Sequence, residues 1–139
     1  MKPTALLRSR LLPLLGFAAL HSLAVAATPA VTRQDLLNAV IDPARSVASI
    51  AIKRVTLQPH SPTGLHLHPC PVIGVVMEGE ILFQLEGGPR QILRAGDAVH
   101  EPANARVLHF DNIGDRPAIL TACYLLAPDQ HELIRLLLQ

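Results

Sequence analysis

The sequence predicts an all-β fold, a compact barrel or sandwich of seven or eight short antiparallel strands framed by two short helices. Two observations lead to this prediction. The 139 residues include 12 Pro and 8 Gly, which favour many short elements joined by turns over a helix bundle. Between those turns, short segments rich in apolar and β-branched residues recur at regular spacing, as in small β-barrels and sandwiches. Half of the residues are hydrophobic, and the length corresponds to one domain.

The first 27 residues have the layout of a secretory signal peptide. Three basic residues precede an apolar stretch at residues 11–25, and Ala24, Val25 and Ala26 give the small-x-small pattern of a cleavage site. We therefore predict export to the periplasm or the exterior, and a mature domain at residues 28–139. A transmembrane anchor is the alternative, although the stretch is shorter than the roughly 20 apolar residues of a membrane span.

The first element after the signal is a predicted helix at residues 32–40. Thr32 is placed as its N-cap, Asp35 completes a capping box, and Pro43 prevents any continuation. Strands separated by turns then follow. We expect them at residues 47–57, 65–68, 73–77, 81–86, 91–93, 98–101, 106–110 and 118–126.

In residues 129–138 the spacing of apolar residues changes from that of a strand to that of a helix. Asp129 and Glu132 form a second capping box, and leucine and isoleucine side chains follow. This pattern predicts a C-terminal amphipathic helix at residues 129–138, which must pack on the barrel or on a partner.

His66 and His68 are the first candidate metal ligands. On a strand, residues i and i+2 point to the same face, so the two imidazoles project side by side and can grip a divalent transition metal. A third ligand must come from elsewhere. We expect His109, because strict alternation on its strand places it on one face with Val107 and Asp111.

Other candidates near this pair leave alternatives open. His100 is a further candidate ligand or hydrogen-bond partner, with a histidine at the rim as the alternative. Glu101 supplies a carboxylate only if its strand twists inward, and a surface position is the expectation. Cys70 and Cys123 form a disulfide after export, or remain two separate thiols.

Two segments of the chain resemble the motifs of the cupin family. Residues 64–69 (GLHLHP) and 75–80 (VVMEGE) resemble the first motif, and residues 96–99 (GDAV) with Glu101 and Pro102 resemble the opening of the second. The resemblance covers residues 47–126. It implies a double-stranded β-helix, or jelly-roll, barrel core over that range, with a metal ion held near one mouth.

The resemblance also implies a ligand set of two histidines and a glutamate from the first motif and a histidine from the second. His66 and His68 match the first two. Val72 occupies the place of the glutamate, and Val107 occupies that of the last histidine, with His109 two residues further on. A site of three histidines is softer than the family's set and leaves a coordination position for water or substrate.

The leading functional hypothesis is therefore an exported cupin-domain protein that binds a divalent transition metal through His66, His68 and His109. The ion is not distinguished among Fe, Mn, Ni, Cu and Zn. If the protein is an enzyme, we expect a metal-dependent, dioxygenase-like oxidoreductase that acts on a small organic molecule. The alternative is a non-catalytic small-ligand-binding or structural cupin module without metal.

Composition narrows the range of partners. A net charge of +1 and 3% aromatic residues give little basis for binding nucleic acid. No segment after the signal has the length of a membrane span. Leu65 and Leu67 must face away from the paired histidines, and apolar surface of this kind favours a second copy of the chain, so we predict a homodimer.

Overall fold

The computed structural model describes residues 30–138. The chain divides into two units, residues 1–33 and residues 34–139. Of the first unit only residues 30–33 are described, and they are exposed and form neither helix nor strand. The predicted signal peptide at residues 1–27 therefore lies outside the described residues.

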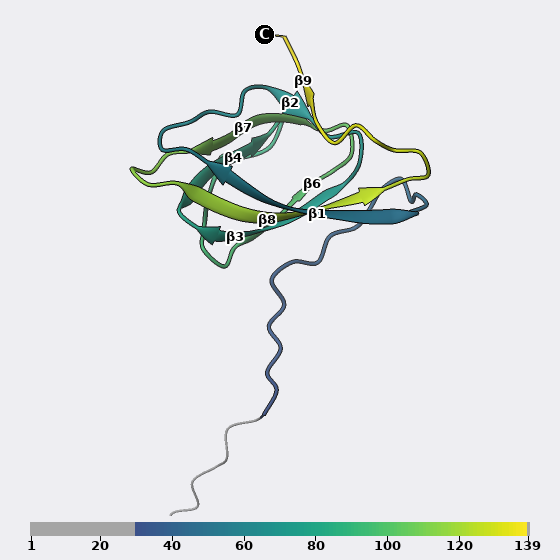
Figure 1. Ribbon diagram of the computed structural model, residues 1–139, viewed down its shortest axis with the longest axis horizontal. Helices are drawn as coiled ribbons and strands as arrows, with labels where there is room; N and C mark the ends of the chain where they lie inside the picture. The colour runs from purple at the N-terminus through teal and green to yellow at the C-terminus, as the bar shows by residue number, and fades with distance from the viewer. Residues whose placement is uncertain (1–29, 139) are drawn as a thin grey trace, which may run out of the picture. The chain divides into compact units, whose positions relative to one another are not determined.

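The second unit is built from nine strands in two antiparallel sheets (Figure 1). The four-stranded sheet has the order β1-β8-β3-β6, and the five-stranded sheet has the order β5-β4-β7-β2-β9. The strands are β1 (Ser49–Leu57), β2 (His66–Leu67), β3 (Val72–Glu78), β4 (Glu80–Leu85), β5 (Gln91–Arg94), β6 (Ala98–Glu101), β7 (Arg106–Asn112), β8 (Ala118–Leu126) and β9 (Arg135–Leu136). The predicted all-β fold is confirmed.

The core is formed by the inward side chains of both sheets. Along β8, burial alternates so that Ala118, Leu120, Ala122 and Tyr124 are buried and the residues between them are partly exposed. This period of two is the signature of a sheet with one face on the core. Apart from the consecutive strands β4 and β5, neighbours in each sheet come from distant parts of the chain, so residues from several strands converge on the same interior.

The tight turn between β3 and β4 depends on Gly79. Its φ is 85°, in the left-handed region that favours glycine, and a Cβ there would lie 2.7 Å from the Ala118 side chain. The turn can therefore pack closely against the start of β8 only with glycine at this position.

The prediction of a C-terminal helix at residues 129–138 is wrong. This segment contains β9, which lies beside β2 (Figure 1). Leu136 of β9 pairs with His66, and Arg135 pairs with Leu67. Strand β2 would otherwise expose unpaired backbone groups at the edge of its sheet, and β9 satisfies them. Local helix propensity is overridden by this tertiary pairing.

The prediction of a helix at residues 32–40 is also wrong. The segment has no helix or strand, and Leu36 and Val40 are 51% and 82% exposed. A helix of nine residues is marginal in water unless an apolar face packs against the rest of the protein, and these two side chains stay largely exposed.

The two cysteines are free thiols. Cys70 is buried in the core, and Cys123 lies on the opposite face of β8 from the buried Ala122 and Tyr124.

Within residues 30–138, no helix has the length and apolar character that crossing a membrane would require.

Candidate metal centre

Strand β2 and the residue after it place two imidazoles inside the protein. His66 and His68 are 3% and 4% exposed, whereas Leu67 between them is only partly buried. Their ring centroids are 5.2 Å apart. The structure thus brings the two histidines together on one inward face.

Backbone carbonyls fix the orientation of both rings. His66 Nδ1 lies 2.8 Å from the Gly64 carbonyl oxygen, and His68 Nδ1 lies 2.5 Å from the Leu133 carbonyl oxygen. A carbonyl oxygen can only accept, so each Nδ1 carries the proton and donates it. When neutral, each ring therefore presents an Nε2 lone pair, which is the arrangement found in metal-binding histidines.

Glu101, at the end of β6, completes the cluster. Its side chain is buried, and its Oε2 atom lies 3.3 Å from His68 Nε2 and 3.8 Å from His66 Nε2. One potential ligand atom from each of the three residues lies within 4.8 Å of the others. Among the described residues, no group forms a hydrogen bond with Glu101 Oε2.

Two lone pairs and a buried carboxylate oxygen that face one another need a cation or a proton between them. A set of two imidazole nitrogens and one carboxylate oxygen suits a divalent transition metal, so the residues present fit such an ion. Without metal, a proton takes this role. Burial would lower the pKa of His68, but the nearby Glu101 carboxylate outweighs burial and raises it. Burial would raise the pKa of Glu101, but the two imidazoles hold it below its ordinary value.

Glu101 is the functional residue that sequence reasoning misplaced at the surface. In β6, Val99 and Glu101 are buried and share one face, while His100 lies on the other. The alternation of β6 contained this signal, because an apolar Val99 directed inward requires Glu101 to be directed inward too.

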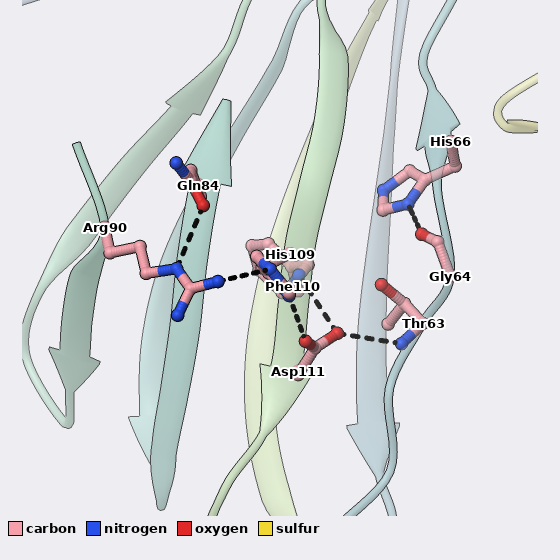
Figure 2. Close-up of polar contacts among 8 residues, drawn as sticks. All are labelled: Thr63, Gly64, His66, Gln84, Arg90, His109, Phe110 and Asp111. Atoms are coloured by element: carbon pink, nitrogen blue, oxygen red, sulfur yellow. Dashed lines mark hydrogen bonds and ion pairs between the residues drawn. The ribbon is translucent and has the colours of Figure 1, made fainter. Parts of the chain in front are cut away.

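His109 is not brought to the pair. Its Nδ1 lies 2.7 Å from Asp111 Oδ2, its Nε2 lies 3.3 Å from Arg90 Nη2, and its side chain is 31% exposed (Figure 2). The cause is a β-bulge. Gln84 pairs with His109 but Leu85 pairs with Val107, so one extra residue in β7 reverses the faces. The expectation of strict alternation along this strand was wrong.

His100 also lies away from the cluster. Its position on β6 is opposite in face to Glu101, and it borders a small pocket together with Asp42 and Arg45. Burial lowers its pKa, and Nε2 forms no hydrogen bond with the described residues. His100 is therefore not positioned as a fourth ligand.

A cavity of about 80 Å³ adjoins the three clustered side chains. Its polar lining is completed by Thr63 and Tyr124. Burial and the charge of Glu101 raise the pKa of Tyr124, so its phenol stays protonated. No Lys or Arg among the described residues lines this cavity, and its other wall residues are apolar: Val55, Leu57, Val72, Phe110, Leu120, Ala122 and Ile134.

Comparison with known proteins relates this architecture to a family. A family model for the cupin domain matches residues 53–124, slightly more than half of the chain. No curated protein matches the chain.

Several solved structures resemble the chain. An oxalate oxidase in complex with the substrate analogue glycolate is 26% identical with a TM-score of 0.53, and the match covers 62% of this chain and 45% of that one. The DMSP lyase DddQ from Ruegeria pomeroyi DSS-3 is 26% identical with a TM-score of 0.55, covering 63% and 43%. A mutant oxalate decarboxylase of Bacillus subtilis is 26% identical with a TM-score of 0.54, covering 63% and 24%. The chain spans less than half of each of these proteins. With the family model matched over more than half of its length, the chain belongs to the cupin family.

Proposed function

We propose that this cupin binds a divalent transition metal through His66, His68 and Glu101 and catalyses the oxygen-dependent oxidation of a small organic molecule. The observation that supports the metal is the convergence of two imidazole nitrogens and a carboxylate oxygen within 4.8 Å of one another, with no hydrogen-bond partner for that oxygen among the described residues. The proposal replaces His109 by Glu101 in the ligand set.

A bound ion would polarise a substrate oxygen as a Lewis acid and, if redox-active, would transfer electrons to dioxygen. The protein residues prepare the site for it. The Gly64 and Leu133 carbonyls hold both imidazoles in one tautomer, and burial of Glu101 excludes bulk water from the carboxylate. Three protein ligands leave coordination positions for substrate.

The lining of the cavity restricts the substrate. The cavity is about half the size of the roughly 150 Å³ cavity that accommodates benzene. A molecule that fits has a polar group directed at His66, His68 and Glu101, and an apolar remainder against the aliphatic wall. The oxalate oxidase neighbour, by its name, acts on a dicarboxylate. Here no Lys or Arg of the described lining would face the second carboxylate, so we propose a small molecule with one polar end.

Metal titration of untagged protein tests the ligand set. We expect one ion of Zn²⁺ or Co²⁺ per chain by calorimetry, and a loss of affinity of at least about tenfold in Glu101→Ala and in His66→Ala plus His68→Ala. His100→Ala is the matched control, because His100 lies on the opposite face of β6 from Glu101, and it should retain the wild-type affinity. Loss of binding in His100→Ala, or full binding in Glu101→Ala, would contradict the proposed site.

The apolar wall favours a second candidate function, a non-catalytic carrier of a small apolar ligand. In that case the histidines and Tyr124 only form hydrogen bonds with the ligand. Native mass spectrometry of metal-free protein separates the two: a retained organic molecule supports the carrier. Oxygen consumption that requires both the metal and a small substrate supports the enzyme.

Export is part of the proposal. It is supported by the layout of residues 1–27, with basic residues before an apolar stretch and a small-x-small site. N-terminal sequencing of protein recovered from the periplasm or medium should start at Ala27 or one residue later. Recovery of the whole chain from the cytoplasm alone would overturn this part.

A homodimer is the proposed assembly. Ile50 and Ile52 on β1 are 61% and 65% exposed, and this strand lies at the edge of the four-stranded sheet. Exposed apolar residues on a sheet edge favour pairing with a second copy. Light scattering should give a dimer for the wild type and a monomer for Ile52→Lys, whereas a monodisperse wild-type monomer at micromolar concentration would end the proposal.

A further inference from the structure

A short hydrogen-bonded path connects the outer face of the five-stranded sheet to the buried His66 (Figure 2). The Asp111 carboxylate accepts the backbone N–H of Thr63, with 3.1 Å between nitrogen and Oδ1. The next residue, Gly64, accepts the Nδ1 proton of His66 at 2.8 Å. Because Thr63 and Gly64 are consecutive, only the backbone of these two residues, with one planar peptide group between them, separates the nitrogen that Asp111 holds from the carbonyl that orients His66.

Asp111 is itself held in place. Its Oδ2 lies 2.7 Å from His109 Nδ1, and its Oδ1 accepts the N–H of Phe110 at 3.3 Å. Arg90 contacts the far nitrogen of the His109 ring at 3.3 Å. The carboxylate therefore has little rotational freedom, and both of its oxygens are used (Figure 2).

No side-chain packing restrains Gly64, the residue two before His66. Gly64 has a φ of 78°, and no heavy atom lies within 4 Å of the position that a Cβ would occupy. A glycine in open space can take up many backbone conformations. The loop is held by hydrogen bonds at three points: the Ser61 carbonyl accepts the Asn112 N–H, the Leu65 carbonyl accepts the Leu137 N–H, and the Thr63 N–H donates to Asp111, the one closest in sequence to Gly64 on its N-terminal side.

We propose that Asp111 is a positioning residue for the metal centre, acting through Thr63 and Gly64 on the ring of His66. This inference rests on the proposed metal function. Without the hydrogen bond from the Thr63 N–H to Asp111, the Gly64 carbonyl would move away from His66 Nδ1. The His66 ring would then no longer present Nε2 in one fixed direction. Groups that orient metal-binding histidines typically contribute about 10- to 100-fold to metal affinity.

Three variants of the full chain test the proposal. Asp111→Ala removes the acceptor of the Thr63 N–H, and we expect Zn²⁺ affinity to fall about tenfold. Asp111→Asn keeps an oxygen for that N–H while removing the charge, so its affinity should stay within about threefold of wild type. Asp115→Ala is the matched control, because it removes the other His–Asp pair, His60 with Asp115 at 2.9 Å, and should have no effect.

A second measurement does not depend on metal. In the metal-free protein, the Nδ1 proton of His66 should give a slowly exchanging NMR signal in the wild type and in Asp111→Asn. It should exchange at least about tenfold faster in Asp111→Ala, while the global Tm of each variant is recorded as a check on folding.

The outcomes separate the two proposals. A wild type that binds no Zn²⁺ refutes the metal function, and proton exchange then decides the role of Asp111 alone. Unchanged affinity and unchanged exchange in Asp111→Ala would overturn the positioning role. Equal losses of Zn²⁺ affinity in Asp111→Ala and Asp111→Asn would also overturn it, because they would assign the effect to the charge of Asp111 instead of its hydrogen bond with Thr63.

Discussion

Val72 on β3 and Glu101 on β6 lie directly opposite each other in the four-stranded sheet. Val72 occupies the position at which the cupin resemblance implies a glutamate, and Glu101 directs its carboxylate into the same interior. The carboxylate of the site thus comes from the neighbouring strand, at the cross-strand position.

This relationship predicts that the carboxylate can be exchanged between the two strands. Glu101→Val should lower Zn²⁺ affinity at least about tenfold, because it removes the anionic ligand. Adding Val72→Glu to Glu101→Val should restore most of the lost affinity, and calorimetric titration measures both. A double variant as weak as Glu101→Val would show that the position opposite Glu101 cannot direct a carboxylate at His66 and His68.

The stabilisation that the His68–Glu101 pair gives the metal-free protein and the stabilisation by added metal should depend on pH in opposite directions. The pKa of His68 is raised above its ordinary 6.5 and that of Glu101 is lowered below its ordinary 4.5. In the metal-free protein, the contribution of His68 to the stability of the fold is present below pH 6.5 and is lost as the pH rises through its raised pKa. That of Glu101 is present above pH 4.5 and is lost as the pH falls through its lowered pKa.

The difference in Tm between metal-free wild type and Glu101→Gln should therefore shrink from about pH 5.5 to about pH 8. The increase in Tm on adding Zn²⁺ should grow over the same interval, because metal binding requires neutral imidazoles. Thermal melts at the two pH values measure both effects. A Zn²⁺-induced shift that is larger at the lower pH would contradict the ligand roles of the histidines.

The turn at Gly79 gives a prediction about stability. Gly79→Ala combines a left-handed φ of 85° with a contact of 2.7 Å to Ala118, and we expect it to lower the free energy of unfolding by about 2–4 kcal/mol. Gly87→Ala is the matched control, with a φ of 76° and open space at its Cβ, and should cost only about 1–2 kcal/mol. Urea denaturation measures both, and equal costs would show that the contact with Ala118 is relieved easily.

The two thiols should differ in reactivity. Cys70 is 1% exposed and burial raises its pKa, so little thiolate is present and reagents cannot reach it. Cys123 is partly exposed on the outer face of β8. Iodoacetamide should modify Cys123 in the native protein and both cysteines after unfolding, as peptide mass spectrometry would show. Equal modification of the native protein would place Cys70 nearer the surface than the structure does.

The sequence was sufficient for eight of the nine strands of the described residues and for two of the three residues of the candidate site. The predicted strands at residues 73–77 and 81–86 and the turn between them rest on local signals, and the structure contains them as β3, β4 and the turn at Gly79. The common face of His66 and His68 also follows from local alternation.

The remaining features depend on contacts between distant segments. The bulge that turns His109 outward exists only in the pairing of β7 with β4, and β9 forms by pairing with the free side of β2, which would otherwise be the edge of the sheet. Neither feature is a property of its own segment, so local periodicity predicted an inward His109 and a C-terminal helix instead. Glu101 differs, because alternation within β6 was enough to place it.

X-ray absorption spectroscopy of the Zn²⁺- or Co²⁺-loaded protein tests the central claim most directly. The ligand set of His66, His68 and Glu101 predicts a first shell with two imidazole nitrogens and protein oxygen at about 2.0–2.2 Å. In Glu101→Gln the imidazole contribution should remain while the oxygen contribution changes. A first shell with three imidazoles, or with none, would contradict the account.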